Sequence, residues 1–216
     1  MKEIRGVLFD LDGVITDTAE YHFEAWKKLA EELDISFDRE FNERLKGVGR
    51  MESLELILNH GEKELSESEK EHFASKKNDH YKTMIANITP NDLLPGILEF
   101  MEEIKEAGIK TALASSSKNA QVVIERLEIT HLLDEVVDAA KLERGKPDPE
   151  IFLKAAEQIN EPVTACVGVE DAQAGVDAIK AANMFAVGVG SYLEKADWIV
   201  EDTSQLELKK LQAKIQ

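Results

Sequence analysis

The chain alternates short apolar runs with segments of helical periodicity, and this alternation limits the folds available to it. The apolar runs are bounded by glycine, serine or acidic residues, and they lie at 4–9, 110–115, 164–169, 184–189 and 197–200. Apolar residues recur at helical spacing in the segments between them, at 96–107, 118–127, 149–159 and 171–182. Strands that alternate with helices predict an α/β protein with a doubly wound parallel sheet.

One long region, from about Thr18 to Leu94, departs from this pattern because it contains no convincing strand. Its apolar residues have helical spacing in three stretches, at 19–33, at 51–58 and from residue 66 onward. The letters "DTAE" at 17–20 are typical of a capping box. Two prolines and a glycine in "TPNDLLPG" at 89–96 indicate the return to the α/β pattern. We therefore expect an α/β core formed by residues 1–16 and 93–216, with an all-helical cap inserted at 17–92.

Composition narrows the range of partners and locations. The 43 acidic residues outnumber the 26 basic ones and give a formal net charge of −17, which disfavours binding to nucleic acid or to an anionic membrane. The single cysteine, Cys166, lies in an apolar run and has no partner for an internal disulfide, as in a reducing compartment. No apolar stretch approaches membrane-spanning length, and Asp10 interrupts any signal peptide. We expect a soluble, cytoplasmic protein, and the acidic surface favours a monomer.

Two aspartates, Asp10 and Asp12, directly follow the first apolar run in "VLFDLDG". Open α/β sheets bind ligands outside the carboxyl ends of their strands, and two carboxylates this close repel each other unless a cation lies between them. Carboxylate oxygens suit Mg²⁺, whereas a calcium loop is excluded because Val14, Ile15 and Tyr21 occupy the positions that need Asp or Asn, Gly and Glu. The alternative is a structural role in the turn, which does not explain the polar residues that end other strands.

Polar residues also follow the later strands. "SSSKN" at 115–119 opens a helix whose backbone N–H groups and Lys118 favour an anion, although a single serine there would be an ordinary N-cap. Lys146 precedes a proline in a loop, where a lone lysine is usually solvated. Glu170 and Asp171 follow the run at 164–169 and can complete a metal site. A nucleophile, phosphate ligands and metal ligands would then share one edge of the sheet.

These motifs resemble, in order, the four motifs of the haloacid dehalogenase (HAD) superfamily of phosphotransferases: "DLDGVITDT", Ser115, Lys146 before proline, and "GVEDAQAG". More narrowly, "FDLDGVITDTAEYHFEAW", "FNERLKGVGR", "KKND", "LLPGI" and "ALASSSKN" are similar to the β-phosphoglucomutase family. The resemblance extends over essentially the whole chain, including the helical region. It implies a HAD-like Rossmannoid core with a helical cap.

The resemblance also implies a chemistry. Asp10 would be the nucleophile that forms an aspartyl-phosphate, and Asp12 would be the general acid and base, for which it must carry a proton in part of the cycle. Ser115 and Lys146 would hold the transferring phosphoryl group. Mg²⁺ would be the cofactor, and the residues at its site would be Asp10, Asp12 through its backbone carbonyl, Asp171, and Glu170 either as a ligand or as a neighbour of the ligands.

A mutase of this family interconverts β-D-glucose 1-phosphate and glucose 6-phosphate through a β-glucose 1,6-bisphosphate intermediate, which also serves as primer. Such an enzyme needs a second phosphate site, and the resemblance assigns it to Arg50, Ser117, Lys118 and Asn119. The cap residues implied to serve the substrate are Thr18, His22, Lys46, Gly47, Val48 and Lys77. Hinges near 14–18 and 88–96 would let the cap close and exclude water.

Simpler interpretations of the cap residues stay open at this point. Lys77 could be solvated, His22 could be an ordinary helix-face histidine, and Arg50 could be a surface charge, although the helix dipole disfavours a cation at a helix start. Two positions depart from the family pattern: Gly49 stands where a serine is expected, and Arg144 stands where small uncharged residues are typical.

Two other functions remain as alternatives. One is a phosphatase of the same superfamily that acts on a sugar phosphate or phosphoglycolate, and it would release inorganic phosphate. The other is a non-catalytic sugar-phosphate sensor. The presence of Asp10, Asp12, Lys146 and Asp171 argues against the sensor, because binding alone does not require both a nucleophile and an acid.

Overall fold

A computed structural model describes residues 3–45 and 48–215 of the chain. The chain divides into two compact units, one formed by Met1–Asp17 with Thr89–Gln216 and the other by Thr18–Ile88. From the sequence, these boundaries were expected at 16/17 and 92/93. Among the described residues, no helix is both long enough and apolar enough to cross a membrane.

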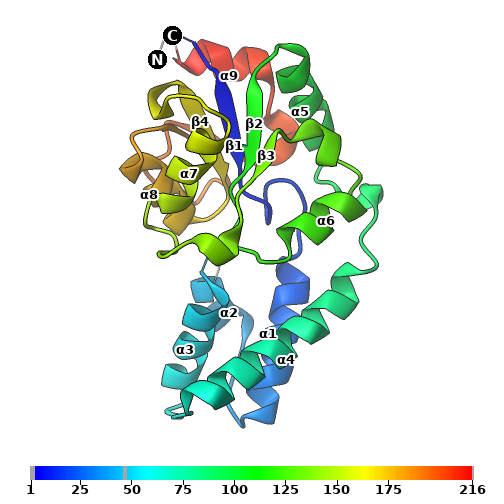
Figure 1. Cartoon of the computed structure of the whole chain (residues 1–216), viewed down its shortest axis with the longest axis vertical. Coiled ribbons are helices and arrows are strands. Elements are labelled where there is room, and N and C mark those ends of the chain that lie inside the picture. The colour runs from blue at the N-terminus through cyan, green and yellow to red at the C-terminus, as the bar shows by residue number, and fades with distance from the viewer. Residues whose placement is uncertain (1–2, 46–47, 216) are drawn as a thin grey trace. The chain divides into compact units, whose positions relative to one another are not determined.

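The first unit contains a parallel sheet, which within the described residues has six strands in the order β3-β2-β1-β4-β5-β6. Figure 1 labels the first four strands of this order. The strands are β1 (Gly6–Phe9), β2 (Lys110–Leu113), β3 (Glu135–Val136), β4 (Cys166–Glu170), β5 (Phe185–Val189) and β6 (Trp198–Val200). The expected doubly wound parallel sheet is confirmed. Strand β3 was not predicted, because a strand of two residues has no detectable periodicity. The strand order reverses between β1 and β4, and such a switch point is where open α/β sheets bind ligands.

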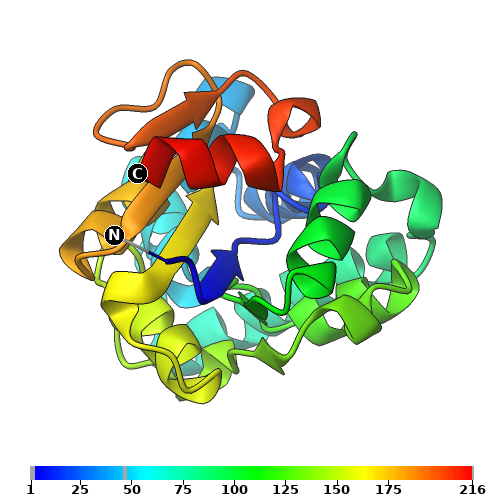
Figure 2. The ribbon, with the colours of Figure 1, turned by 90° about the horizontal axis from the view of Figure 1, so that it is seen from above.

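Helices cover both faces of this sheet. They are α5 (Ile97–Glu106), α6 (Ala120–Arg126), α7 (Glu150–Gln158), α8 (Gln173–Ala181) and α9 (Leu208–Ile215). Successive strand residues point to opposite faces, so Leu8 packs in a buried cluster with residues of α7 and α8, whereas the ring of Phe9 lies 6.1 Å from the ring of Phe100 on α5. Helix α9 packs against α5 (Figure 2). The two central strands are therefore buried on both sides, as their almost continuous apolar sequences require.

The second unit consists of helices, as expected. They are α1 (Ala19–Glu32), the short α2 (Arg39–Asn42), α3 (Arg50–His60) and α4 (Glu67–Ile85), and α4 packs against both α1 and α3 (Figure 1). Its core includes Trp26 of α1, Leu54 of α3 and Ala74 of α4. Short 3-10 turns in the chain lie at Glu43–Leu45, Pro90–Asp92, Thr130–Leu132, Ala139–Lys141, Val163–Ala165 and Thr203–Gln205.

The capping box expected at 17–20 is wrong, and a different one is present. The N-cap of α1 is Thr18 and not Asp17, so Glu20 is the second residue of the helix. The Glu20 carboxylate accepts hydrogen bonds of 2.7 and 2.8 Å from the Arg39 guanidinium. An ion pair with α2 thus engages the carboxylate that the predicted box needs. At α4 the Glu69 carboxylate accepts a hydrogen bond of 2.8 Å from the Ser66 N–H, and the Ser66 hydroxyl faces the Glu69 N–H in return.

Helix α9 provides a test of the packing on the α5 face. Leu211 is fully buried, whereas Leu153 on α7 is 40% exposed. We expect Leu211→Ala to lower the free energy of unfolding by about 2–5 kcal/mol, because it leaves a cavity, and Leu153→Ala to lower it by roughly 0.5 kcal/mol or less. Urea unfolding followed by far-UV circular dichroism measures both. Equal losses in the two variants would contradict the docking of α9.

Candidate active site

The site forms where β1 and β4 end, side by side, at the switch point of the sheet. The Asp10 N–H donates to the Val169 carbonyl at 3.0 Å, so Asp10 prolongs the pairing of the two strands, and Glu170 is the last residue of β4. Both side chains are buried. Asp10 and Glu170 are far apart in the sequence, and the parallel pairing of β1 with β4 brings them together.

Lys146 joins these two acids. Its Nζ donates to Asp10 Oδ1 at 2.7 Å and also to Glu170 Oε1, and it lies 5.2 Å from the centre of the Phe152 ring. The lysine is 5% exposed, so the solvated alternative is wrong. Burial by itself would lower the pKa of Lys146, but the charges of Asp10 and Glu170 outweigh it and raise the pKa above the ordinary lysine value. Lys146 therefore holds a positive charge at the end of β1.

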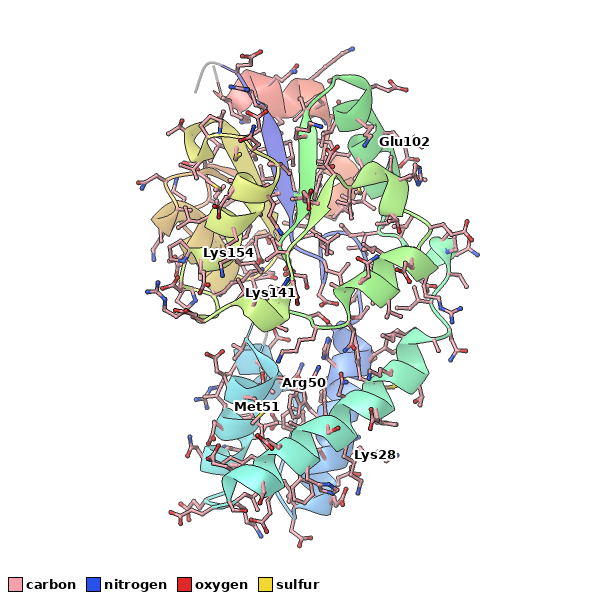
Figure 3. All side chains as sticks on the ribbon, viewed as in Figure 1. Lys28, Arg50, Met51, Glu102, Lys141 and Lys154 are labelled. Carbon is pink, nitrogen blue, oxygen red and sulfur yellow. The ribbon has the colours of Figure 1, made fainter. Side chains whose placement is uncertain are left out.

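The loop that presents Lys146 is held by its own hydrogen bonds. The Glu150 carboxylate accepts from the backbone N–H groups of residues 143–144, the shorter bond being 2.8 Å. Lys154, one turn further along α7, pairs with Glu150 and donates to the Lys141 carbonyl at 3.0 Å (Figure 3). The hydrogen bond from Lys154 and those from the two backbone groups lower the pKa of Glu150 to about 2. A carboxylate at the start of α7 thus organises the loop before Lys146.

Glu150 and Phe152 were not predicted as part of the site. Their only sequence signal is position, because both follow Lys146 closely at the start of α7. An acid in the first turn of a helix is common for reasons of the helix dipole alone. Neither the loop hydrogen bonds of Glu150 nor the position of the Phe152 ring beneath Lys146 could be inferred from that spacing.

Acidic oxygens gather at the same strand ends. Asp10, Glu170 and Asp171 offer carboxylate oxygens that lie within 4.8 Å of one another, and hard oxygen ligands of this kind fit Mg²⁺. Both oxygens of Glu170 already accept hydrogen bonds, Oε1 from Lys146 and Oε2 from the Ala172 N–H at 2.9 Å. Burial raises the pKa of Glu170, and the charge of Lys146 opposes that rise. A Cβ at Gly175 would lie 1.9 Å from the Glu170 carboxyl carbon, so only glycine fits beneath this side chain.

Asp12 lies in the turn that follows β1 and is half-buried. The Gly13 N–H donates to the Thr16 carbonyl at 2.8 Å, and Asp12 forms an isolated bridge with Thr16. The Thr16 hydroxyl in turn donates to the Asp92 carbonyl at 2.7 Å, which ties the turn to the returning chain. Among the described residues, the carboxylate of Asp12 is not part of the close acidic group, so its expected share in a metal site is its backbone carbonyl.

The serine loop follows β2, the other neighbour of β1. Ser115 is buried, and its Oγ accepts from the Ser117 N–H at 3.1 Å; the Ser117 Oγ accepts from the Asn119 N–H at 3.2 Å. Two of the backbone N–H groups expected to bind an anion therefore donate within the loop. Asn119 is buried at the N-cap position of α6, and Lys118 is exposed. The structure thus places Ser115 just after β2, the strand that pairs with β1, which Asp10 follows.

The helical unit contains a second buried lysine. Lys77 of α4 is 4% exposed, and its Nζ lies 2.8 Å from His22 Nδ1 and 4.5 Å from the Trp26 ring centre. The His22 ring stacks on Tyr81 at a centroid distance of 4.1 Å. The interpretation of Lys77 as a solvated residue is wrong. An ammonium only donates hydrogen bonds, so His22 Nδ1 is the acceptor and His22 is neutral.

Other predicted residues of the helical unit are placed as follows. Burial, reinforced by the charges of Lys77 and Arg50, holds the pKa of His22 well below its ordinary value. Arg50 is the first residue of α3 and is half-buried (Figure 3). Burial lowers the pKa of Arg50, and the charge of Asp79 opposes this. Val48 is half-buried, and the Thr18 hydroxyl contacts Tyr81, whereas Lys46 and Gly47 lie outside the described residues.

Comparison with known proteins identifies the class to which this fold and site belong. Residues 4–183 match the model of a hydrolase family, the haloacid dehalogenase-like hydrolases, and the chain belongs to this family. The chain is 50% identical to a β-phosphoglucomutase of Bacillus subtilis, an alignment that covers 96% of this chain and 94% of that protein. A crystal structure of β-phosphoglucomutase from Clostridium difficile matches with a TM-score of 0.96 and 49% identity, over 98% of this chain and 96% of that one. A phosphorylated carbohydrates phosphatase of Thermotoga maritima is 31% identical, over 84% of this chain and 82% of that protein.

The His22–Lys77 pair predicts a pH dependence of stability. Folded His22 binds fewer protons than the unfolded residue, whose pKa is about 6.5, so the free energy of unfolding should fall as pH drops below that value, by up to about 1.4 kcal/mol per pH unit. His22→Asn keeps an acceptor without a titration and should remove this part of the slope.

The measurement is urea unfolding between pH 7.5 and 5.5, followed by tryptophan fluorescence in a Trp198→Phe background that leaves Trp26 as the reporter in the helical unit. His72→Asn, on the exposed side of α4, is the matched control. The same slope in His22→Asn and in the control would contradict the neutral state of His22.

Proposed function

We propose that this chain is a β-phosphoglucomutase, an isomerase that interconverts β-D-glucose 1-phosphate and glucose 6-phosphate. The observation that carries this proposal is the 50% identity to such an enzyme over 96% of the chain, because this likeness includes the helical unit as well as the catalytic core. The arrangement of Asp10, Lys146 and Glu170 at the switch point supports phosphoryl transfer as the chemistry. The monomeric state and the cytoplasmic location stay predictions.

In the proposed reaction, Asp10 attacks the phosphoryl group of a bound bisphosphate. A bond forms between phosphorus and the Asp10 oxygen, while the bond between phosphorus and the sugar oxygen breaks. Asp12 donates a proton to the departing sugar oxygen. In the next step the 6-hydroxyl of β-glucose 1-phosphate attacks the aspartyl-phosphate, Asp12 takes its proton, and β-glucose 1,6-bisphosphate is formed. Transfer of the 1-phosphate of this intermediate to Asp10 then releases glucose 6-phosphate.

The neighbouring side chains have distinct tasks in this proposal. Asp10, Asp171 and the backbone carbonyl of Asp12 would hold Mg²⁺, which when bound supplies positive charge to the transferring phosphoryl group. Lys146 provides a fixed positive charge 2.7 Å from Asp10 Oδ1. We assign Glu170 to the orientation of Lys146 and not to the ion, because both of its oxygens accept hydrogen bonds from the protein. Ser115 would bind the same phosphoryl group.

A mutase must also bind the phosphate that is not being transferred. Arg50 is the strongest candidate, because a guanidinium can bind a phosphate through two parallel hydrogen bonds. Ser117, Lys118 and Asn119 are the candidates on the core. In the helical unit, Thr18, His22, Lys77 and Val48 are the proposed substrate-binding residues within the described part of the chain, with Lys46 and Gly47 proposed from sequence alone.

A sugar-phosphate phosphatase is the second candidate, and it is favoured by the 31% identity to a phosphorylated carbohydrates phosphatase. The same nucleophile and lysine serve hydrolysis if water, instead of a sugar hydroxyl, attacks the aspartyl-phosphate. The product therefore distinguishes the two functions. A non-catalytic sensor has no need for the pairing of a buried nucleophile with Lys146.

The activity is tested by a ³¹P and ¹H NMR time course with the full chain, Mg²⁺, β-glucose 1-phosphate and a trace of β-glucose 1,6-bisphosphate. We expect conversion to glucose 6-phosphate without accumulation of inorganic phosphate. Asp10→Asn, or chelation of Mg²⁺ with EDTA, should abolish the conversion, because each removes a group on which phosphoryl transfer depends. Asp202→Asn, in a turn before α9, is the control aspartate and should act as wild type. Release of inorganic phosphate from the substrate would assign the chain to the phosphatases.

The role of Arg50 is tested separately. Arg50→Ala should lower kcat/KM for the mutase reaction roughly 10- to 100-fold, which corresponds to loss of a charge-assisted hydrogen bond, while slow release of inorganic phosphate persists. Arg50→Lys should recover only part of the rate, because an ammonium cannot form the paired bonds. Arg44→Ala, which removes another arginine of the helical unit, is the control. Mutase rates in Arg50→Ala equal to those of wild type would reject this role.

A further inference from the structure

A single peptide group beside the proposed metal site is held from both ends. The carbonyl of Asp171 accepts a hydrogen bond of 2.7 Å from the Tyr192 hydroxyl, and the N–H of the same peptide, on Ala172, donates to Glu170 Oε2 at 2.9 Å. This peptide group joins Asp171 to Ala172 in the connection between β4 and α8. Asp171 is one of the acids in the close carboxylate group. The orientation of this peptide group sets the position of the Asp171 backbone, from which the carboxylate extends.

The Tyr192 ring packs against the backbone of Gly190. Gly190, directly after β5, has a φ of +124°, and a Cβ at that position would lie 2.6 Å from Tyr192 Cε1. Leu193 is buried in the core beneath the same loop, and its N–H donates to the Gly190 carbonyl at 3.2 Å. Tyr192 itself is 64% exposed, so its ring contributes little to the core. The loop is anchored by Leu193, which leaves the Tyr192 hydroxyl directed at the Asp171 carbonyl.

A second pair of hydrogen bonds joins the connection between β4 and α8 to the loop after β5. The Gln173 side chain accepts a hydrogen bond from the Glu194 N–H at 2.8 Å and donates to the Glu194 carbonyl at 3.2 Å. Gln173 is the first residue of α8, two positions after Asp171. The segment that carries Asp171 is therefore fastened to the loop after β5 on both sides of Ala172.

The Asp171 carboxylate is confined on its other side. A Cβ at Gly13 would lie 2.2 Å from Asp171 Oδ2, so the carboxylate packs directly against the backbone of the turn after β1. That turn also contains Asp12. A shift of the Asp171 backbone would therefore change the distance between the Asp171 carboxylate, after β4, and the turn after β1.

We propose that Tyr192 is a positioning residue that orients Asp171 for binding the divalent cation. Gln173 assists it by holding the same segment to the loop after β5. The inference rests on the proposed metal site at Asp10 and Asp171. Residues that orient a metal ligand through a hydrogen bond act on metal affinity without touching the ion. Tyr192 holds the backbone of the ligand, and the exposed position of its ring separates this role from core packing.

The test measures binding of Mn²⁺ to the full chain by electron paramagnetic resonance, which detects free Mn²⁺, followed by displacement with Mg²⁺. Tyr192→Phe removes only the hydroxyl, and we expect roughly three- to tenfold weaker binding of both ions, with a melting temperature of the metal-free protein close to that of wild type. Gln173→Ala should weaken binding in the same direction. Tyr21→Phe, the same atomic change on α1, should bind as wild type.

Two further comparisons separate the possible results. Asp171→Asn should abolish tight binding, which shows that the measured site is the proposed one. Wild-type binding that depends on Asp171, together with unchanged affinity in Tyr192→Phe, overturns the role of Tyr192 alone. Loss of affinity in Tyr192→Phe only to the extent that the protein has unfolded overturns it as well. Wild-type protein that shows no binding dependent on Asp171 overturns the proposed metal site and this inference with it.

Discussion

The buried charge of Lys146 is the interaction on which the catalytic core depends. Removing an ammonium from water costs free energy, and here Asp10 and Glu170 compensate for that cost from the ends of two adjacent strands. The pairing connects the two strand ends with the loop that carries Lys146. It also reaches the start of α8, because the Ala172 N–H at its N-cap donates to Glu170 Oε2. The same three charges would meet a phosphoryl group, so the groups that stabilise the fold locally also form the reactive centre.

The two units stabilise their buried lysines in different ways. Lys146 is matched by two carboxylates, which keep it charged. Lys77 instead lies 4.5 Å and 5.0 Å from the centres of the Trp26 and Tyr81 rings, and its Nζ lies 2.8 Å from His22 Nδ1. A cation balanced by acids is suited to hold a nucleophile in place. Aromatic rings attract a cation placed over their faces, and this contact contributes to holding Lys77 inside the helical unit.

Local sequence patterns predicted most of the helices and strands. They failed where the structure of a segment depends on contacts with residues far along the chain. All five apolar runs contain a strand, because β-branched runs bounded by turn residues have few other stable conformations. Strand β3 and helix α9 were missed: the first is too short for periodicity, and the second is stabilised by packing on α5. The capping box at 17–20 failed because α1 begins one residue later, with Thr18 as its N-cap, and the Glu20 carboxylate pairs with Arg39 of α2. Lys77 reads as a solvated residue until α1 and α4 are packed together.

The sequence by itself determined the alternation of strands and helices, the helical insertion and the polar residues that end the strands, because each of these depends on neighbours within a few positions. From those strand ends, Asp10, Lys146, Glu170 and Asp171 could be named as candidates. Only the tertiary structure decided which of them touch. Parallel pairing of β1 with β4 sets the contact of Asp10, Lys146 and Glu170, and the loop after β5 brings Tyr192 to Asp171. Hydrogen bonds of this kind have no periodicity and no fixed spacing, because they join segments whose separation along the chain is arbitrary.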